Sequence, residues 1–265
     1  MADNMSPAAS GGIIKRIGTV SEATPPWTWL DMTNSFFLLV ILVLFIGTFF
    51  GFLIVNIING EMTVDLQGLA TVLGWLIGSL VTVVTILRLQ RRHPDTWAAL
   101  KLQQSSTPIP FLLLFGLGVA VFLDVVGLVI SGDITPVPQI IYLTPVVGVF
   151  GWVVNVLFVT IAQPAAEELV FRGVIQPFFR ARAGAWGGLA VTSLLFAVFH
   201  FAAFASLLPA DTTDINLIWK VLILPYTLSM IMGAVRVVTG STRATIVTRA
   251  GAGIFMVIAA LVIAG

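Results

Sequence analysis

Apolar and polar positions along the chain form long blocks instead of alternating residue by residue. A helix needs about 20 consecutive apolar residues to cross the hydrocarbon core of a bilayer. Seven runs of about that length predict transmembrane helices at 34–58, 68–89, 111–130, 140–162, 185–207, 218–235 and 244–264. The expected fold class is an all-α, polytopic membrane helical bundle.

The linkers between these runs carry turn residues, as in NGEMTVD (59–65) and SGDITPVPQ (131–139). Residues 1–28 are polar and lack the apolar core of a signal peptide, which predicts a flexible cytoplasmic tail. We expect residues 29–161 to form N-terminal transmembrane helices and residues 162–265 to form a core that carries the chemistry.

Lysine and arginine side chains fall almost entirely in alternate linkers, with Lys220 as the exception. By the positive-inside rule this pattern places the amino terminus in the cytoplasm and the carboxyl terminus outside. The composition agrees with a membrane protein, since 58% of the residues are hydrophobic and 9% are charged. The spread of the basic residues along the linkers also predicts no nucleic-acid partner.

The chain has no cysteine, which excludes disulfides, thiolate nucleophiles and cysteine-ligated metals. The absence of cysteine and the small soluble linkers predict a prokaryotic plasma membrane as the location. Two GxxxG pairs, Gly47 with Gly51 and Gly184 with Gly188, predict close helix contacts and permit dimers, but they leave the oligomeric state undetermined.

The stretch AQPAAEELVFRGV (162–174) places three charged side chains next to an apolar run. Glu168 and Arg172 are four residues apart and share a helix face, so they can pair. Glu167 points about 100° away and lacks that partner. An unpaired acid at membrane depth indicates function, whereas a solvated cluster just outside the bilayer is the structural alternative.

His200 ends the apolar stretch TSLLFAVFH (192–200) of the predicted fifth helix. A carboxylate and an imidazole from neighbouring helices can hold one water, with the carboxylate as its base. An interhelical histidine tie is the alternative for His200. A proton-coupled transporter is the alternative for Asp124, Glu167 and Lys220, although the two halves of the chain show no internal symmetry.

Together these stretches resemble the CAAX-processing and bacteriocin-processing membrane protease family, also called the type II CAAX prenyl endopeptidase or abortive-infection-like family. Its motif EExxxR is matched by Glu167, Glu168 and Arg172, and its motif FxxxH by Phe196 and His200. The resemblance covers roughly residues 162–253. It implies an intramembrane endopeptidase in which Glu167 activates water, His200 assists, Glu168 pairs with Arg172 and Phe196 packs beside the site.

The same resemblance implies a peptide or protein substrate, which eukaryotic members take in prenylated form. It also exposes a departure, because the family's third motif has a histidine followed four residues later by asparagine. Here these positions hold Arg249 and Gly253, or Thr248 if the register shifts by one. A relative that binds a peptide or lipidated partner without cleaving it is therefore the alternative function.

Arg249 has three interpretations: an oxyanion donor, a salt bridge to Glu167 that removes the base, or a snorkelling arginine at the membrane edge. With His200 as the one histidine in a predicted span, we expect no metal cofactor. Glu167, Glu168 and His200 still leave a divalent metal such as zinc open as an alternative.

Overall fold

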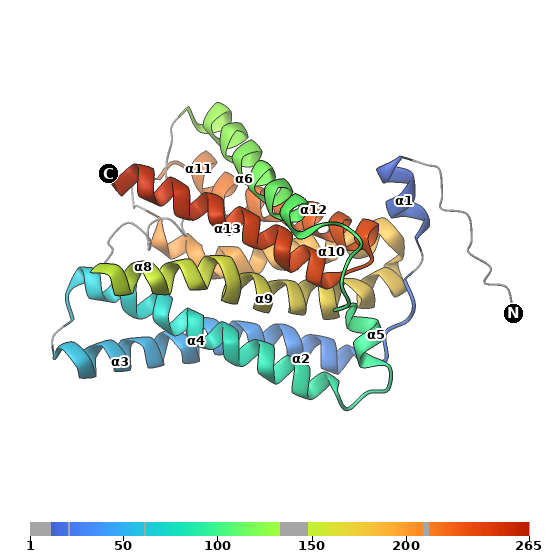
Figure 1. The fold of residues 1–265 in the computed structure, drawn as a ribbon, viewed down its shortest axis with the longest axis horizontal. Helices are drawn as coiled ribbons and strands as arrows, with labels where there is room; N and C mark the ends of the chain where they lie inside the picture. Colours follow the sequence, from blue (N-terminus) through green and yellow to red (C-terminus); the bar gives the residue numbers. More distant parts are fainter. Residues whose placement is uncertain (1–11, 21, 61, 133–147, 209–211, 265) are drawn as a thin grey trace, which may run out of the picture.

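The computed structural model describes the chain apart from residues 1–11, 21, 61, 133–147, 209–211 and 265. Every regular element in this described part is a helix, and most helices run along the long axis of one elongated bundle (Figure 1). The elements are α1 (Ile13–Thr19), α2 (Trp29–Val40), η1 (Ile41–Gly47), α3 (Thr48–Asn59), α4 (Val64–Gln90), α5 (Thr96–Leu100), α6 (Ile109–Ser131), α8 (Gly148–Leu157), η2 (Phe158–Ala162), α9 (Gln163–Glu168), η3 (Leu169–Ile175), α10 (Gln176–Phe204), η4 (Ala205–Leu207), α11 (Asp214–Ile218), η5 (Trp219–Ile223), α12 (Leu224–Thr239) and α13 (Thr242–Ala264).

Six helical stretches of the described residues are long and apolar enough to cross a membrane, which confirms the polytopic helical bundle. The stretch Gly148–Leu207 contains both the fourth and the fifth predicted spans. The count of seven and the orientation of the amino terminus stay predictions. Residues 140–147, where the fourth span was expected to begin, lie outside the described residues.

The chain turns back on itself at Gly184, inside α10. Gly184 has φ 75° and ψ 179°, a backbone conformation that side-chain-bearing residues essentially never adopt. A Cβ atom on Gly188 would collide with the backbone of Arg180, so the two arms of the turn touch there. This GxxxG pair therefore serves a turn within the chain. The pair Gly47 and Gly51 instead packs on the backbone of α4, as the sequence predicts.

Wide π-helical turns precede three prolines in the apolar helices. The turns η2, η3 and η5 end two residues before Pro164, Pro177 and Pro225, respectively. Proline lacks an N–H and clashes with the carbonyl four residues earlier, and a wider turn accommodates both defects. The chain therefore stays helical through Pro164, with a π-helical turn directly before α9.

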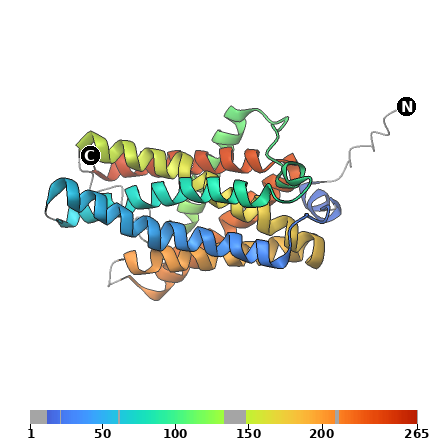
Figure 2. The same cartoon turned by 90° about the horizontal axis from the view of Figure 1, so that it is seen from below.

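The segment α9–η3, which carries the two glutamates, lies at the centre of the bundle. It packs against α2, α4, α10 and α13, and Figure 2 shows α2 and α4 side by side along the bundle. The buried core surrounds it, with Val170, Phe171 and Val174 fully buried. Any polar side chain on α9 is therefore enclosed by protein, and needs partners from the neighbouring helices.

Residues 12–20 and 22–28, predicted from sequence as part of a tail, lie against the bundle in the structure. The short helix α1 packs on α10 and α12, with Ile17 buried against Leu189 and Val237. Trp27 is buried and donates a hydrogen bond from its indole to the carbonyl oxygen of Val174, at 3.1 Å. Residues 1–11, the remainder of the predicted tail, are outside the described part.

Candidate active site

Glu167 projects from α9 into the interior, where its side chain is 3% exposed. The side-chain amide of Gln163, one helical turn earlier, donates a hydrogen bond to Glu167 Oε1 at 2.7 Å. The other oxygen, Oε2, has no hydrogen-bond partner among the described residues. The solvated cluster outside the bilayer is therefore not what the structure shows, since both Glu167 and Glu168 are buried.

His200 faces Glu167 from α10. Its Nδ1 donates to the carbonyl oxygen of Phe196 at 3.2 Å, because a carbonyl can only accept. The Phe196 ring stacks on the imidazole with centroids 4.2 Å apart. Nε2 points the other way and lies 3.9 Å from Glu167 Oε1. That distance is too long for a direct hydrogen bond but short enough for both atoms to bind one water.

Arg249 approaches the same carboxylate from α13. Its Nη2 lies 3.5 Å from Glu167 Oε2, and its side chain is 3% exposed. Thr248 is turned away, since its hydroxyl donates to the carbonyl of Ala244 at 2.9 Å. Gly253, at the asparagine position of the family motif, packs on the backbone of Val159. Arg249 is therefore the group that stands where the third-motif histidine was expected, and it does not snorkel to the membrane edge.

Glu168 and Arg172 form the predicted pair, with Arg172 Nε 3.2 Å from Glu168 Oε2 and both side chains fully buried. Arg172 Nη2 also donates to the carbonyl and the hydroxyl of Ser229 on α12, at 2.8 Å each. The guanidinium lies over the face of Phe196, 4.9 Å from its centroid. Phe196 thus contacts both the charged pair and His200, which fixes their relative positions.

A narrow cavity of about 10 Å³ adjoins Glu167 and Gln163. A space of that size accommodates roughly one water molecule. Its remaining lining is apolar apart from Ser79, and includes Trp75 and Phe199. The carboxylate therefore has room beside it for one small molecule.

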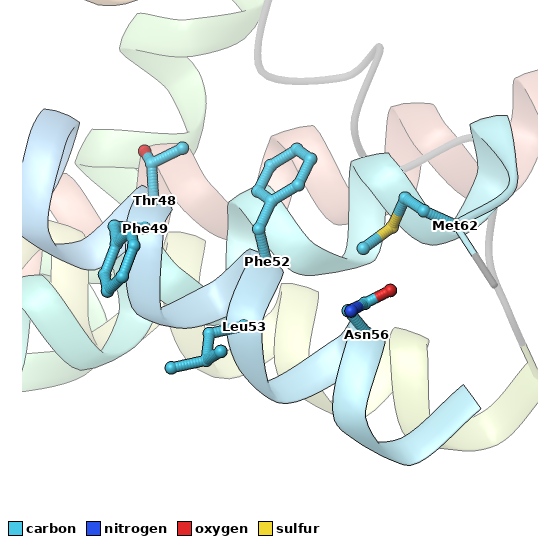
Figure 3. A pocket seen from close by; sticks show the side chains of 6 residues that line it. All are labelled: Thr48, Phe49, Phe52, Leu53, Asn56 and Met62. Carbon is cyan, nitrogen blue, oxygen red and sulfur yellow. The ribbon is translucent and has the colours of Figure 1, made fainter. Parts of the chain in front are cut away.

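A second, larger hollow lies on the outer surface of the bundle, and its lining includes Phe49, Phe52, Asn56 and Met62 (Figure 3). None of its lining residues comes from α9, α10 or α13. It is therefore separate from the candidate site.

The described residues contain no group of three or more His, Asp or Glu side chains that could hold a metal ion. Zinc takes three or four such ligands. Here Glu167 and His200 converge, but Glu168 is turned to Arg172, and Arg249 brings a positive charge to the position a further ligand would need. This donor set does not fit zinc.

Sequence reasoning missed two residues of the site, Gln163 and Ser229. Gln163 lies four residues before Glu167, a helical spacing that was readable from the sequence. Ser229 gave no comparable signal. Asp124 on α6 lies near enough to Lys220 on η5 for the two charges to interact.

Residues 137–255 match the family model described as type II CAAX prenyl endopeptidase Rce1-like. No curated protein and no solved structure matches the chain. The matched range includes Glu167, Glu168, Arg172, Phe196, His200 and Arg249.

Proposed function

Because residues 137–255 make this chain a member of the Rce1-like type II CAAX prenyl endopeptidase family, we propose that it hydrolyses a peptide bond inside the membrane with a water held between Glu167 and His200. The substrate is a peptide or protein, lipidated or plain. By the distribution of its basic residues, the site opens towards the cytoplasmic side of a prokaryotic plasma membrane.

The observation that carries the proposal is the 3.9 Å separation of Glu167 Oε1 and His200 Nε2. A neutral imidazole with its hydrogen on Nδ1 leaves Nε2 as an acceptor, and the carboxylate oxygen is an acceptor as well. A water between them donates one hydrogen to each, which leaves an oxygen lone pair directed away from both. That lone pair is the nucleophile.

In the reaction, the water oxygen forms a bond to the carbonyl carbon of the scissile peptide while its proton passes to Glu167. The carbonyl oxygen becomes an oxyanion. Collapse of this intermediate breaks the C–N bond, and the proton on Glu167 passes to the leaving amine. No covalent enzyme intermediate forms, and the products are a carboxylic acid and an amine.

Arg249 stabilises the oxyanion in this scheme. Its Nη2 lies on the Oε2 side of the carboxylate, opposite the side that faces His200. Its buried Nε has no hydrogen-bond partner among the described residues, so a donor remains available. A fixed donor in an enclosed site stabilises a developing oxyanion by roughly 3 kcal/mol.

A second candidate function is peptide binding without cleavage. The ion pair of Arg249 with Glu167 at 3.5 Å favours it, because a neighbouring cation makes a carboxylate a weaker base. In that case the Glu167 side chain is a structural anion, and the protein holds a peptide without cleaving it.

The two functions are separated by peptide hydrolysis assays on the purified protein in lipid nanodiscs. A library of prenylated and plain peptides is offered to wild type, Glu167→Gln and His200→Gln. Catalysis by this pair predicts cleavage by wild type and a loss of about 10²- to 10⁴-fold in each variant. His93→Gln is the matched control, because His93 pairs with Asp31 at 3.3 Å in another part of the chain.

Arg249→Gln decides the role of the arginine. Oxyanion stabilisation predicts a fall in kcat with little change in KM, since the donor acts in the transition state. The binding function is established instead if the wild-type protein binds peptides without cleaving them and the Arg249→Gln variant cleaves them.

A further inference from the structure

Three cationic side chains surround Glu22 at the end of the bundle where α5 lies. Lys101 Nζ is 3.0 Å from Oε1, Arg180 Nε is 3.6 Å from Oε2, and Arg236 Nη1 is 2.9 Å from both oxygens. The side chains of Glu22, Arg180 and Arg236 are at most 3% exposed. These four residues belong to four different parts of the chain, and none of them contacts Glu167.

One carboxylate does not balance three cations. Three positive charges and one negative charge leave a net charge of +2 in a largely enclosed place. Two buried donors, Arg180 Nε and Arg236 Nη2, also lack hydrogen-bond partners among the described residues. Buried charge without full compensation is costly, so an anion of higher charge fits this cluster better than Glu22 does.

The cations are held in place largely by the bundle itself. Lys101 adopts the left-handed conformation, with φ 51° and ψ 47°, which is uncommon for a residue with a side chain. Its carbonyl accepts the backbone N–H of Thr242 at 2.8 Å, which ties this conformation to the start of α13. Arg236 Nε donates to the Thr242 hydroxyl at 3.4 Å. These contacts of Lys101 and Arg236 involve neither Glu22 nor α1, so they do not depend on Glu22.

Glu22 lies on a segment that the bundle holds weakly. Helix α1 has seven residues, of which Ile17 alone is buried. Apart from Ile17 and Glu22, the α1 segment is attached by two hydrogen bonds from Arg180 Nη2, to the carbonyls of Ile17 at 3.3 Å and Val20 at 2.7 Å, and the chain is next anchored at the buried Trp27. Short segments with few buried contacts open at low free energy. When this segment opens, all three cations lose partners together.

We propose that Lys101, Arg180 and Arg236 form a phosphate-binding site that Glu22 occupies in this structure, and that a phosphate group displaces Glu22 and the α1 segment. A phosphomonoester carries about −1.5 to −2 charges and three acceptor oxygens, so it compensates the three cations more fully than the single charge of Glu22 does. The group comes from a soluble phosphate or from a phosphomonoester lipid headgroup at the membrane surface. This site does not depend on the proposed peptidase activity.

Direct binding of inorganic phosphate to the full-length protein in phosphatidylcholine nanodiscs is the first test. Equilibrium dialysis compares wild type with Glu22→Gln, which keeps the shape of the side chain and removes its charge. Removing a tethered competitor predicts phosphate binding at least about tenfold tighter in Glu22→Gln. Adding Lys101→Gln to that variant abolishes the gain, whereas adding Arg243→Gln, an exposed arginine outside the cluster, leaves it unchanged.

The second test leaves Glu22 in place and follows the segment. The chain has no cysteine, so Ile14→Cys, at a position 75% exposed on α1, accepts a single spin label. If the source is a soluble phosphate, inorganic phosphate increases the mobility of the label more than chloride does at equal ionic strength. Nanodiscs with phosphatidic acid, but not with phosphatidylglycerol, mobilise it if the source is a headgroup.

The proposal is wrong if neither phosphate nor phosphatidic acid mobilises the label beyond its matched control. It is also wrong if Glu22→Gln and wild type bind phosphate equally. Because the label experiment keeps Glu22 and all three cations, it decides the question even if the glutamine variant fails to fold.

Discussion

Variants of Glu168 and Arg172 test whether the two adjacent glutamates have different roles, one in stability and one in turnover. Both members of this pair are fully buried, 3.2 Å apart. We expect Glu168→Gln to destabilise the protein strongly, because the variant leaves the Arg172 charge buried without its counter-ion. Glu167→Gln, one residue earlier, is expected to remove turnover while leaving most of the stability.

The magnitude follows from the geometry. Removing one member of a buried pair costs about 3–5 kcal/mol, which is a factor of roughly 10²–10³ or more in the unfolding equilibrium. Arg172 keeps its two hydrogen bonds to Ser229 in the variant, so the lower half of that range applies. In Glu168→Leu/Arg172→Met neither charge remains, and what is lost is about 1 kcal/mol per hydrogen bond to Ser229.

Unfolding in detergent, followed by the fluorescence of the seven tryptophans, measures these free energies. We expect a large loss of unfolding free energy in each single variant of the pair, a smaller loss in the double variant, and none in the exposed control Arg243→Gln. A Glu168→Gln variant within about 0.5 kcal/mol of wild type refutes the reasoning, since a change of that size is typical of a surface position. So does a double variant whose loss equals the sum of the single losses.

Three further outcomes are expected. Because the donor set at Glu167 does not fit zinc, EDTA or phenanthroline leaves the rate of peptide cleavage within about twofold of the untreated rate. A larger loss of activity that added zinc restores contradicts this prediction. Gly184→Ala lowers the free energy of unfolding by about 1–3 kcal/mol, whereas Gly118→Ala, in a helix with open space around it, does not; thermal melts of both decide. Burial raises the pKa of Glu22, but the charges of Arg236 and Lys101 and their hydrogen bonds lower it below its ordinary value of 4.5 overall. A lowered pKa means that docking of α1 is retained above pH 4.5 and lost as the pH falls below it, which spin-label mobility follows; docking that persists after Glu22 is protonated argues against the ion pairs.

The sequence was sufficient for contacts that lie within one helix or one motif. The four-residue spacing of Glu168 and Arg172 predicted their pairing, and the apolar runs predicted the helical bundle. The convergence of Glu167 with His200 came from the two motifs together, and the distance of 3.9 Å agrees with a shared water. These features follow from local periodicity, which a single sequence displays directly.

Contacts between distant parts of the chain were not predictable in the same way. Glu22 meets Arg236 across 214 residues of sequence, and its segment reads only as a polar tail. For Arg249 the sequence left three interpretations, because the rotation of α13 decides which side chain faces Glu167. That rotation is set by close backbone contacts, such as Gly116 on Thr248 and Gly251 on Leu113, whose partners periodicity does not identify.

The position of Glu167 depends on a ladder of polar contacts that begins beside it. Glu168, Arg172, Gln176 and Arg180 recur every four residues along α9 to α10, and the two middle members bond α12. Arg172 donates to Ser229, and the Gln176 amide donates to the carbonyl of Gly233 at 3.1 Å. A slip of α12 by one residue would leave these buried donors without acceptors, at a cost of about 1–3 kcal/mol each. In an apolar bundle, where helices slide easily against one another, such obligatory polar contacts fix the register. The arginine of the EExxxR motif therefore holds the helix that presents Glu167, which gives the second glutamate a structural role beside the carboxylate that we propose to be catalytic.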